Sequence, residues 1–251
     1  MKNLDTDKEK EDGNGLVVSY LTQRNLIGLS GMLLPLALAI FPKRETAYHG
    51  LEPSISDYYY TDRGDILVVF LCVIGVFLVT YKGYTWVERS LTIVAAIAGM
   101  GVAFVPTHKD CDDCLLSVHT DNGGVFPTIA GTGWHFACAA VFLLSLAAMS
   151  LYFFPMSDEN AKLKTGAGKK SPKAKRNRVY RICGWTMVAS VAILGIYFLI
   201  RPDLNHFPVV YTLETVAVEA FGISWLTKGE TLWPDGEHYL VRAFRELKSK
   251  A

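Results

Sequence analysis

The chain has 251 residues, of which 51% are hydrophobic, and a formal net charge of +1 at pH 7. This composition is too apolar for a soluble enzyme whose helices must each keep a polar face, and the near-zero net charge favours neither acidic nor basic partners. The charged residues cluster between long apolar segments, as expected because a charge in hydrocarbon is costly. The sequence therefore predicts an all-α fold, a polytopic membrane helix bundle.

Six segments are predicted to cross the membrane as helices. Roughly 20 apolar residues cover about 30 Å of hydrocarbon, and the clearest candidate, residues 65–81, is uncharged from Ile66 to Val79. The third segment is short and contains Gly99 and Gly101, so it either extends at its ends or packs closely against a neighbour. Five spans would remain if it failed to cross. The six predicted spans are residues 25–41, 65–81, 91–105, 134–154, 180–200 and 207–226.

The distribution of Lys and Arg predicts the orientation of the six transmembrane helices. Twenty of the 25 basic residues lie on the side that holds both termini, and five lie on the other side. The positive-inside rule then places both termini in the cytoplasm. The domains are a cytoplasmic segment (1–24), a six-helix transmembrane domain (25–226) and a cytoplasmic tail (227–251). We expect an integral membrane protein, in the plasma (inner) membrane if the source is bacterial.

Two cytoplasmic segments have an alternative interpretation. Residues 162–181 are rich in Lys and Arg and could bind anionic lipid headgroups or serve only to orient the chain. In the tail, residues 237–248 are predicted to form a helix with one apolar face. Such a helix is typical of the membrane surface, but also of a helix packed under the bundle. Topology already explains the basic loop, so the expected partners are membrane lipids and not nucleic acid. A homo-oligomer is compatible with the sequence.

Residues able to coordinate or donate protons gather in the outer loops. Cys111 and Cys114 lie on the oxidising side, where a loop-stapling disulfide is expected; a zinc site with His108 is the alternative. Cys72, Cys138 and Cys183 lie within spans and are interpreted as small apolar fillers.

Two carboxylates lie inside the last predicted span. Counted from Phe207 at the outer edge, Glu214 is about 10 Å deep and Glu219 about 18 Å deep. The two side chains point about 140° apart, so one narrow seam cannot hold both. Glu214 is interpreted as structural. Glu219 suits a metal ligand, proton carrier or general base, and equally a buried hydrogen bond between helices.

Asp57 and His135 are predicted to meet the outer end of the last span in one outward-facing pocket. Asp57 shortly precedes the second span, and His135 opens the fourth beside Trp134, a residue typical of the membrane interface. A carboxylate, an imidazole and a glutamate together are what a metal-activated water or a proton-coupled site requires.

A family resemblance rests on the same residues. The run Pro53-Ser54-Ile55-Ser56-Asp57 before the second span, His135, and Tyr211-Thr212-Leu213 with Glu219 resemble the DRAM/Frag/Sfk family of six-span proteins and bacterial DUF998-type relatives. This family is distantly similar to ceramidase-like membrane hydrolases. The resemblance implies a pocket of Ser54, Ser56, Asp57, His135 and Glu219. The donor groups of Asp57, His135 and Glu219 themselves suit a divalent metal such as zinc (Zn), whereas the resemblance argues against zinc, because the H-x-x-x-H pair of those hydrolases is missing.

Two functions remain open from the sequence. The first is a lipid-directed hydrolase or lipid-remodelling enzyme, in which Asp57, His135 and Glu219 bind a metal or activate water while Ser54 or Ser56 orients the substrate. The second is a non-catalytic lipid or small-molecule binding, transport or assembly protein. In that protein the same residues form a hydrogen-bonded girdle that holds the outer loops.

Overall fold

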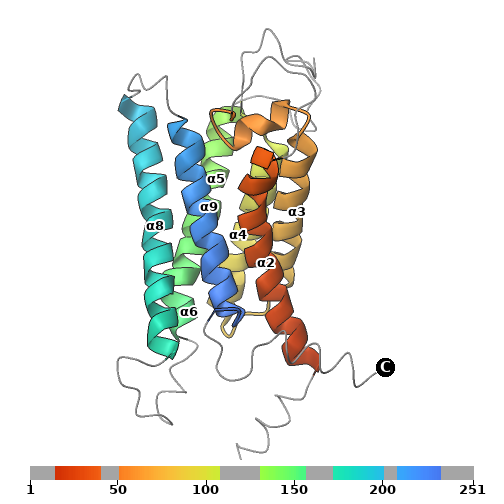
Figure 1. The fold of residues 1–251 in the computed structure, drawn as a ribbon, viewed down its shortest axis with the longest axis vertical. Coiled ribbons are helices and arrows are strands. Elements are labelled where there is room, and N and C mark those ends of the chain that lie inside the picture. The colour runs from red at the N-terminus through yellow and green to blue at the C-terminus, as the bar shows by residue number, and fades with distance from the viewer. Residues whose placement is uncertain (1–14, 41–50, 108–130, 157–171, 201–207, 233–251) are drawn as a thin grey trace, which may run out of the picture.

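The computed structural model describes residues 15–40, 51–107, 131–156, 172–200 and 208–232, and within these ranges it contains helices and no strands (Figure 1). The all-α prediction is confirmed. A 3₁₀ helix, η1 (Ser56–Tyr60), and a π-helical turn, η2 (Met149–Phe153), which continues into α6 (Phe154–Met156), accompany six long helices. These are α2 (Gly15–Ile40), α3 (Gly64–Thr80), α4 (Trp86–Phe104), α5 (Gly131–Ala148), α8 (Pro172–Ile200) and α9 (Val209–Lys228).

Several predictions from the sequence concern residues outside these ranges. They are the disulfide or zinc site at Cys111 and Cys114, the cytoplasmic segment before residue 15, the amphipathic tail at 237–248 and much of the basic loop.

Five of the described helices are long and apolar enough to cross a membrane: α2 from Tyr20, α4, α5 with its continuation to Met156, α8 from Lys173, and α9. These helices indicate an integral membrane protein. The short helix is α3, whose 17 residues fall below the length of the other five. The sequence predicts instead that residues 65–81, with the most uniform apolar run, form the clearest span and that residues 91–105 form the shortest one.

The third predicted span is longer in the structure because α4 has a capped start. The Thr85 hydroxyl accepts a hydrogen bond from the Glu88 backbone N–H at 3.1 Å, while the Glu88 carboxylate accepts one from the Tyr84 N–H at 2.7 Å. This reciprocal arrangement is close to a capping box, which satisfies backbone donors that a helix start leaves free. The helix therefore begins at Trp86 and not near Leu91.

The glycines of α4 also pack closely against α5, as predicted. A Cβ atom on Gly99 would lie 3.0 Å from the Phe142 ring, and one on Gly101 would lie 2.6 Å from the Cys138 Sγ. Close approach of helices through small residues is how membrane helices gain van der Waals contact. Both parts of the expectation for this segment, extension and close packing, are therefore confirmed.

The helices form a closed ring in which each packs on its neighbour in the chain and α9 returns to α2 (Figure 1). The first helix ends and α3 begins at the end of the bundle that η1 covers, so successive helices run in opposite directions. Beneath η1, a core cluster contains Leu34, Leu38, Ile55, Tyr58, Leu67, Leu71, Ala103 and Tyr211. The cavity described below lies in this part of the bundle.

Pro155 accounts for the π-helical turn in the fourth predicted span. A proline inside a regular α-helix clashes with the carbonyl four residues earlier and has no N–H to donate. Here the preceding turn widens, and the Phe154 N–H bonds to the carbonyl of Met149. The wider turn lets Phe154 face the core, fully buried between the rings of Tyr180 and Trp225.

A buried polar network links α2 to α4 at the end of the bundle opposite η1. Arg24 and Glu88 are 5% and 2% exposed, and the Tyr81 hydroxyl lies between them, accepting from Arg24 Nη2 at 3.4 Å and donating to Glu88 Oε1 at 2.9 Å. The Tyr20 ring lies 3.9 Å from the guanidinium carbon. The Glu88 carboxylate can only accept, so the Tyr81 hydroxyl is the donor in this hydrogen bond.

Replacing Tyr81 with phenylalanine is expected to destabilise the protein by about 1–3 kcal/mol, because two buried charged groups lose their shared partner. Thermal unfolding of the detergent-purified protein measures the effect. Tyr152→Phe is the matched control, since the Tyr152 side chain is 63% exposed. Equal unfolding temperatures for the two variants would show that the network contributes nothing to stability.

Candidate functional site

The 3₁₀ helix η1 positions the two residues at the centre of the site. Its start is capped by Ser54, whose hydroxyl accepts a hydrogen bond from the Asp57 N–H at 3.0 Å. Tyr58 is fully buried and anchors the helix in the bundle, with its ring 6.0 Å from that of Tyr211. Ser56 is therefore turned into the bundle and is 8% exposed, whereas Asp57 remains half-buried.

Ser56 forms a hydrogen-bonded pair with His135. The Ser56 Oγ lies 2.8 Å from His135 Nε2, and His135 Nδ1 lies 2.7 Å from the carbonyl oxygen of Val105, the residue that follows α4. A carbonyl can only accept, so Nδ1 carries a proton. In the neutral ring Nε2 is then unprotonated and accepts the hydrogen bond from Ser56. His135 is 3% exposed, so its ring lies inside the bundle.

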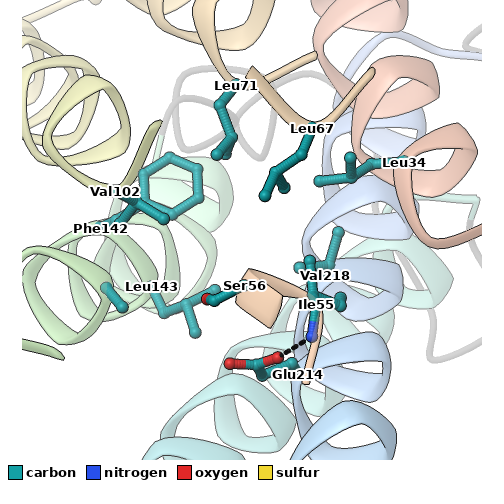
Figure 2. Close-up of a pocket in the computed structure, with 11 residues that line it drawn as sticks. Leu34, Ile55, Ser56, Leu67, Leu71, Val102, Phe142, Leu143, Glu214 and Val218 are labelled. Carbon is teal, nitrogen blue, oxygen red and sulfur yellow. Dashed lines mark hydrogen bonds between the residues drawn. The ribbon is translucent and has the colours of Figure 1, made fainter. Parts of the chain in front are cut away.

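Glu214 of α9 holds the residue next to Ser56. One oxygen of its carboxyl group accepts a hydrogen bond from the Ile55 N–H at 2.6 Å, and Figure 2 shows the other oxygen directed away from this bond. This contact fixes the backbone at the start of η1 against α9. It also satisfies an N–H that would otherwise be buried without a partner, which is costly in an apolar interior.

Ser56 and Glu214 lie on a small cavity among α2, α3, α4, α5 and α9 (Figure 2). Its volume is about 60 Å³. The other lining residues are apolar: Leu34, Ile55, Leu67, Leu71, Val102, Ala139, Phe142, Leu143 and Val218. The cavity is thus a partly open apolar hollow with one hydroxyl and one carboxyl group on its wall.

The predicted site residues do not all meet. Ser56 and His135 are in contact, Ser54 supports η1, and Asp57 is near enough to interact electrostatically with His135 and Glu214. The Glu219 side chain neither lines the cavity nor forms a hydrogen bond with a described residue.

The metal ligands expected from the sequence, Asp57, His135 and Glu219, do not fit a shared ion in the structure. Among the described residues, no group of three or more His, Cys, Asp or Glu side chains could hold a metal ion. The carboxyl group found beside Ser56 belongs to Glu214, which the sequence led us to interpret as structural. A divalent metal in this protein stays a prediction, and metal content of the purified protein and its Asp57→Ala, His135→Ala and Glu219→Ala variants is its test.

The pattern of large side chains in the last span contained a signal for Glu214. Phe221 and Trp225 are fully buried and lie two and three helical turns beyond Glu214 on the same face, whereas Val216, near Glu219 on the helix surface, is 42% exposed. The Val105 carbonyl had no such signal, because a main-chain acceptor leaves no trace in the pattern of side chains.

No family model, curated protein or solved structure matches this chain. The resemblance to the DRAM/Frag/Sfk family therefore stays a prediction from the sequence.

The chemistry available to the site follows from the geometry of three groups. A serine hydroxyl becomes a nucleophile when a neighbouring base accepts its proton and a third group holds that base in the correct tautomer. Ser56, His135 and the Val105 carbonyl meet this description within normal hydrogen-bond distances. A serine hydroxyl held in this way is the kind of nucleophile that acyl-transfer reactions use.

Proposed function

We propose that the protein crosses the membrane six times, with both termini in the cytoplasm and the η1 end facing outward. The course of the chain supports the sixth crossing: η1 lies at one end of the bundle, while α4 begins at Trp86 at the opposite end. The helix between them, α3, has to carry the chain across although it has only 17 residues. Basic residues concentrated on the side of the termini support the orientation.

We propose that the outward-facing site performs acyl transfer or hydrolysis on an ester of a membrane lipid. The Ser56–His135–Val105 hydrogen-bond chain carries this proposal. Ser56 Oγ attacks the ester carbonyl carbon while His135 Nε2 takes its proton. His135 then returns this proton to the departing alcohol oxygen as the ester bond breaks, which leaves an acyl-serine. Water or a second alcohol repeats the sequence and frees Ser56.

The remaining predicted residues act by position in this proposal. Ser54 holds the first turn of η1, and Glu214 holds the Ile55 backbone, so both orient Ser56. The negative charge of Asp57 interacts favourably with the protonated ring that His135 becomes during the reaction. Glu219 has no assigned step.

The test is covalent labelling by a fluorophosphonate, a probe that reacts with activated serine hydroxyls. We expect one label per chain on the wild-type protein in lipid nanodiscs, located at Ser56 by peptide mass spectrometry. Ser56→Ala and His135→Asn should lose the label. Ser145→Ala is the matched control and should keep it, because Ser145 is about as buried as Ser56 but belongs to the last turn of α5. A wild-type protein that resists the probe contradicts the proposed enzyme.

A second function, the non-catalytic girdle, is favoured by the helices that these hydrogen bonds connect. They join η1 to His135 of α5, to Val105 at the end of α4 and to Glu214 of α9, so they hold one end of the bundle together. A girdle of this kind predicts that Ser56→Ala and His135→Asn lower thermal stability while the wild-type protein never reacts with the fluorophosphonate. A lipid-binding protein with closed outer loops would fit that result.

A further inference from the structure

The size and lining of the cavity beside Ser56 indicate which part of the ester substrate it holds. We infer that the acyl group taken up by Ser56 is short, such as acetyl to butyryl, and that the alcohol is the membrane-bound part of the ester. This inference rests on the proposed acyl transfer. It commits to a substrate class, namely short-chain acyl esters of a lipid or lipid-linked alcohol.

Cavity volume sets the length of the acyl group. A protein cavity of about 150 Å³ accommodates benzene, which corresponds to about 25 Å³ for each carbon. The cavity at Ser56 has a volume of about 60 Å³. It therefore has room for roughly two or three carbons, and the rest of a long acyl chain would have to lie outside it.

The walls of the cavity are held in place by packing behind them. Leu67 and Leu71 of α3 are 2% and 4% exposed, and Phe142 of α5 is 5% exposed. A Cβ on Gly99 would lie 3.0 Å from the Phe142 ring, so this ring already rests on the α4 backbone and cannot retreat toward it. Close-packed interiors yield little to a larger guest. The cavity is thus expected to select by length.

The polar groups set the direction in which the ester enters. Ser56 and Glu214 lie together on the wall, while Leu67, Leu71 and Phe142 lie across the cavity from them in Figure 2. A carbonyl carbon within reach of Ser56 Oγ therefore directs its alkyl end toward these apolar side chains. The alcohol oxygen then points out of the cavity, so the bulk of the substrate remains outside.

The experiment compares p-nitrophenyl acetate, butyrate and octanoate as substrates for the full chain in nanodiscs. The rate of the Ser56→Ala variant is subtracted each time, which removes spontaneous hydrolysis. We expect kcat/KM for acetate and butyrate to exceed that for octanoate at least tenfold. One methylene that does not fit a pocket already changes discrimination by about 10- to 200-fold.

A widened cavity provides the second measurement. Leu71→Ala should raise the octanoate-to-butyrate ratio of kcat/KM at least tenfold, because it opens the wall opposite Ser56. Leu78→Ala is the matched control: Leu78 is 0% exposed on the same helix, two turns away in the other core cluster, and its truncation should leave the ratio unchanged.

The outcomes separate this inference from the proposed function. Absence of any Ser56-dependent hydrolysis would refute the acyl-transfer enzyme itself. Ser56-dependent hydrolysis in which octanoate matches or exceeds butyrate would refute the short-chain inference alone, as would a Leu71→Ala variant whose ratio stays at the wild-type value.

Discussion

The His135→Asn variant is expected to lose Ser56-dependent ester hydrolysis by about 10²- to 10⁴-fold, the usual contribution of a general base. An asparagine amide can still donate to the Val105 carbonyl as His135 Nδ1 does at 2.7 Å. It has no atom at the position of Nε2, so nothing accepts the proton of Ser56. Initial rates with p-nitrophenyl butyrate, together with the unfolding temperature, separate lost chemistry from lost structure.

The double variant Ser56→Ala/His135→Asn provides the control for this first prediction. Residues that act as one unit in a reaction have strongly non-additive effects. The double variant should therefore be no slower than Ser56→Ala alone. Additive losses in kcat/KM would mean that Ser56 and His135 act separately, and the hydrogen bond of 2.8 Å between them would then serve structure only.

A large effect on stability is also expected at the crossing of α2 and α9. A Cβ on Gly28 would lie 2.7 Å from the Gly222 carbonyl oxygen and 2.8 Å from the Leu226 backbone nitrogen. Both neighbours are backbone atoms, so the helices must separate to admit a methyl group. Gly28→Ala is therefore expected to destabilise the protein by about 1–3 kcal/mol despite the higher helix propensity of alanine.

Gly195→Ala is the matched control for this second prediction. Gly195 lies within α8, and a Cβ there would meet no atom within 4 Å. Only helix propensity changes, so this variant should be neutral or more stable by about 0.5–1 kcal/mol. Unfolding by a graded mixture of SDS and mild detergent measures both. A Gly28→Ala variant as stable as Gly195→Ala would contradict the close crossing of the two helices.

The helices could be predicted from the sequence because long apolar runs are signals within a single segment. The same holds for local packing at Gly99 and Gly101, where small residues in a short span predicted close contact. Helix ends were harder to place. The start of α4 depends on hydrogen bonds between Thr85 and Glu88, which extend the helix beyond its apolar part.

The candidate site could be predicted only in part because it joins segments that are far apart in the chain. Ser56 and His135 were both expected at the outer end, but their pairing depends on the rotation of η1 and α5. The choice between Glu214 and Glu219 depends likewise on the rotation of α9, since only one can face the bundle. The spacing of apolar side chains along one segment predicts which face of a helix is buried, but it does not predict which residue of another helix that face contacts.

The short α3 helix places a mechanical demand on the surrounding lipid in the proposed six-span arrangement. Its 17 residues rise about 26 Å, less than the usual hydrocarbon thickness of about 30 Å. The exposed side chains on its outer face are Val69, Val73, Val76 and Val79. Lipid beside α3 must compress to match, at a fraction of a kcal/mol for each ångström. Hydrophobic mismatch of this kind favours thin bilayers, so the protein should partition into regions of shorter acyl chains when membranes of mixed thickness are offered.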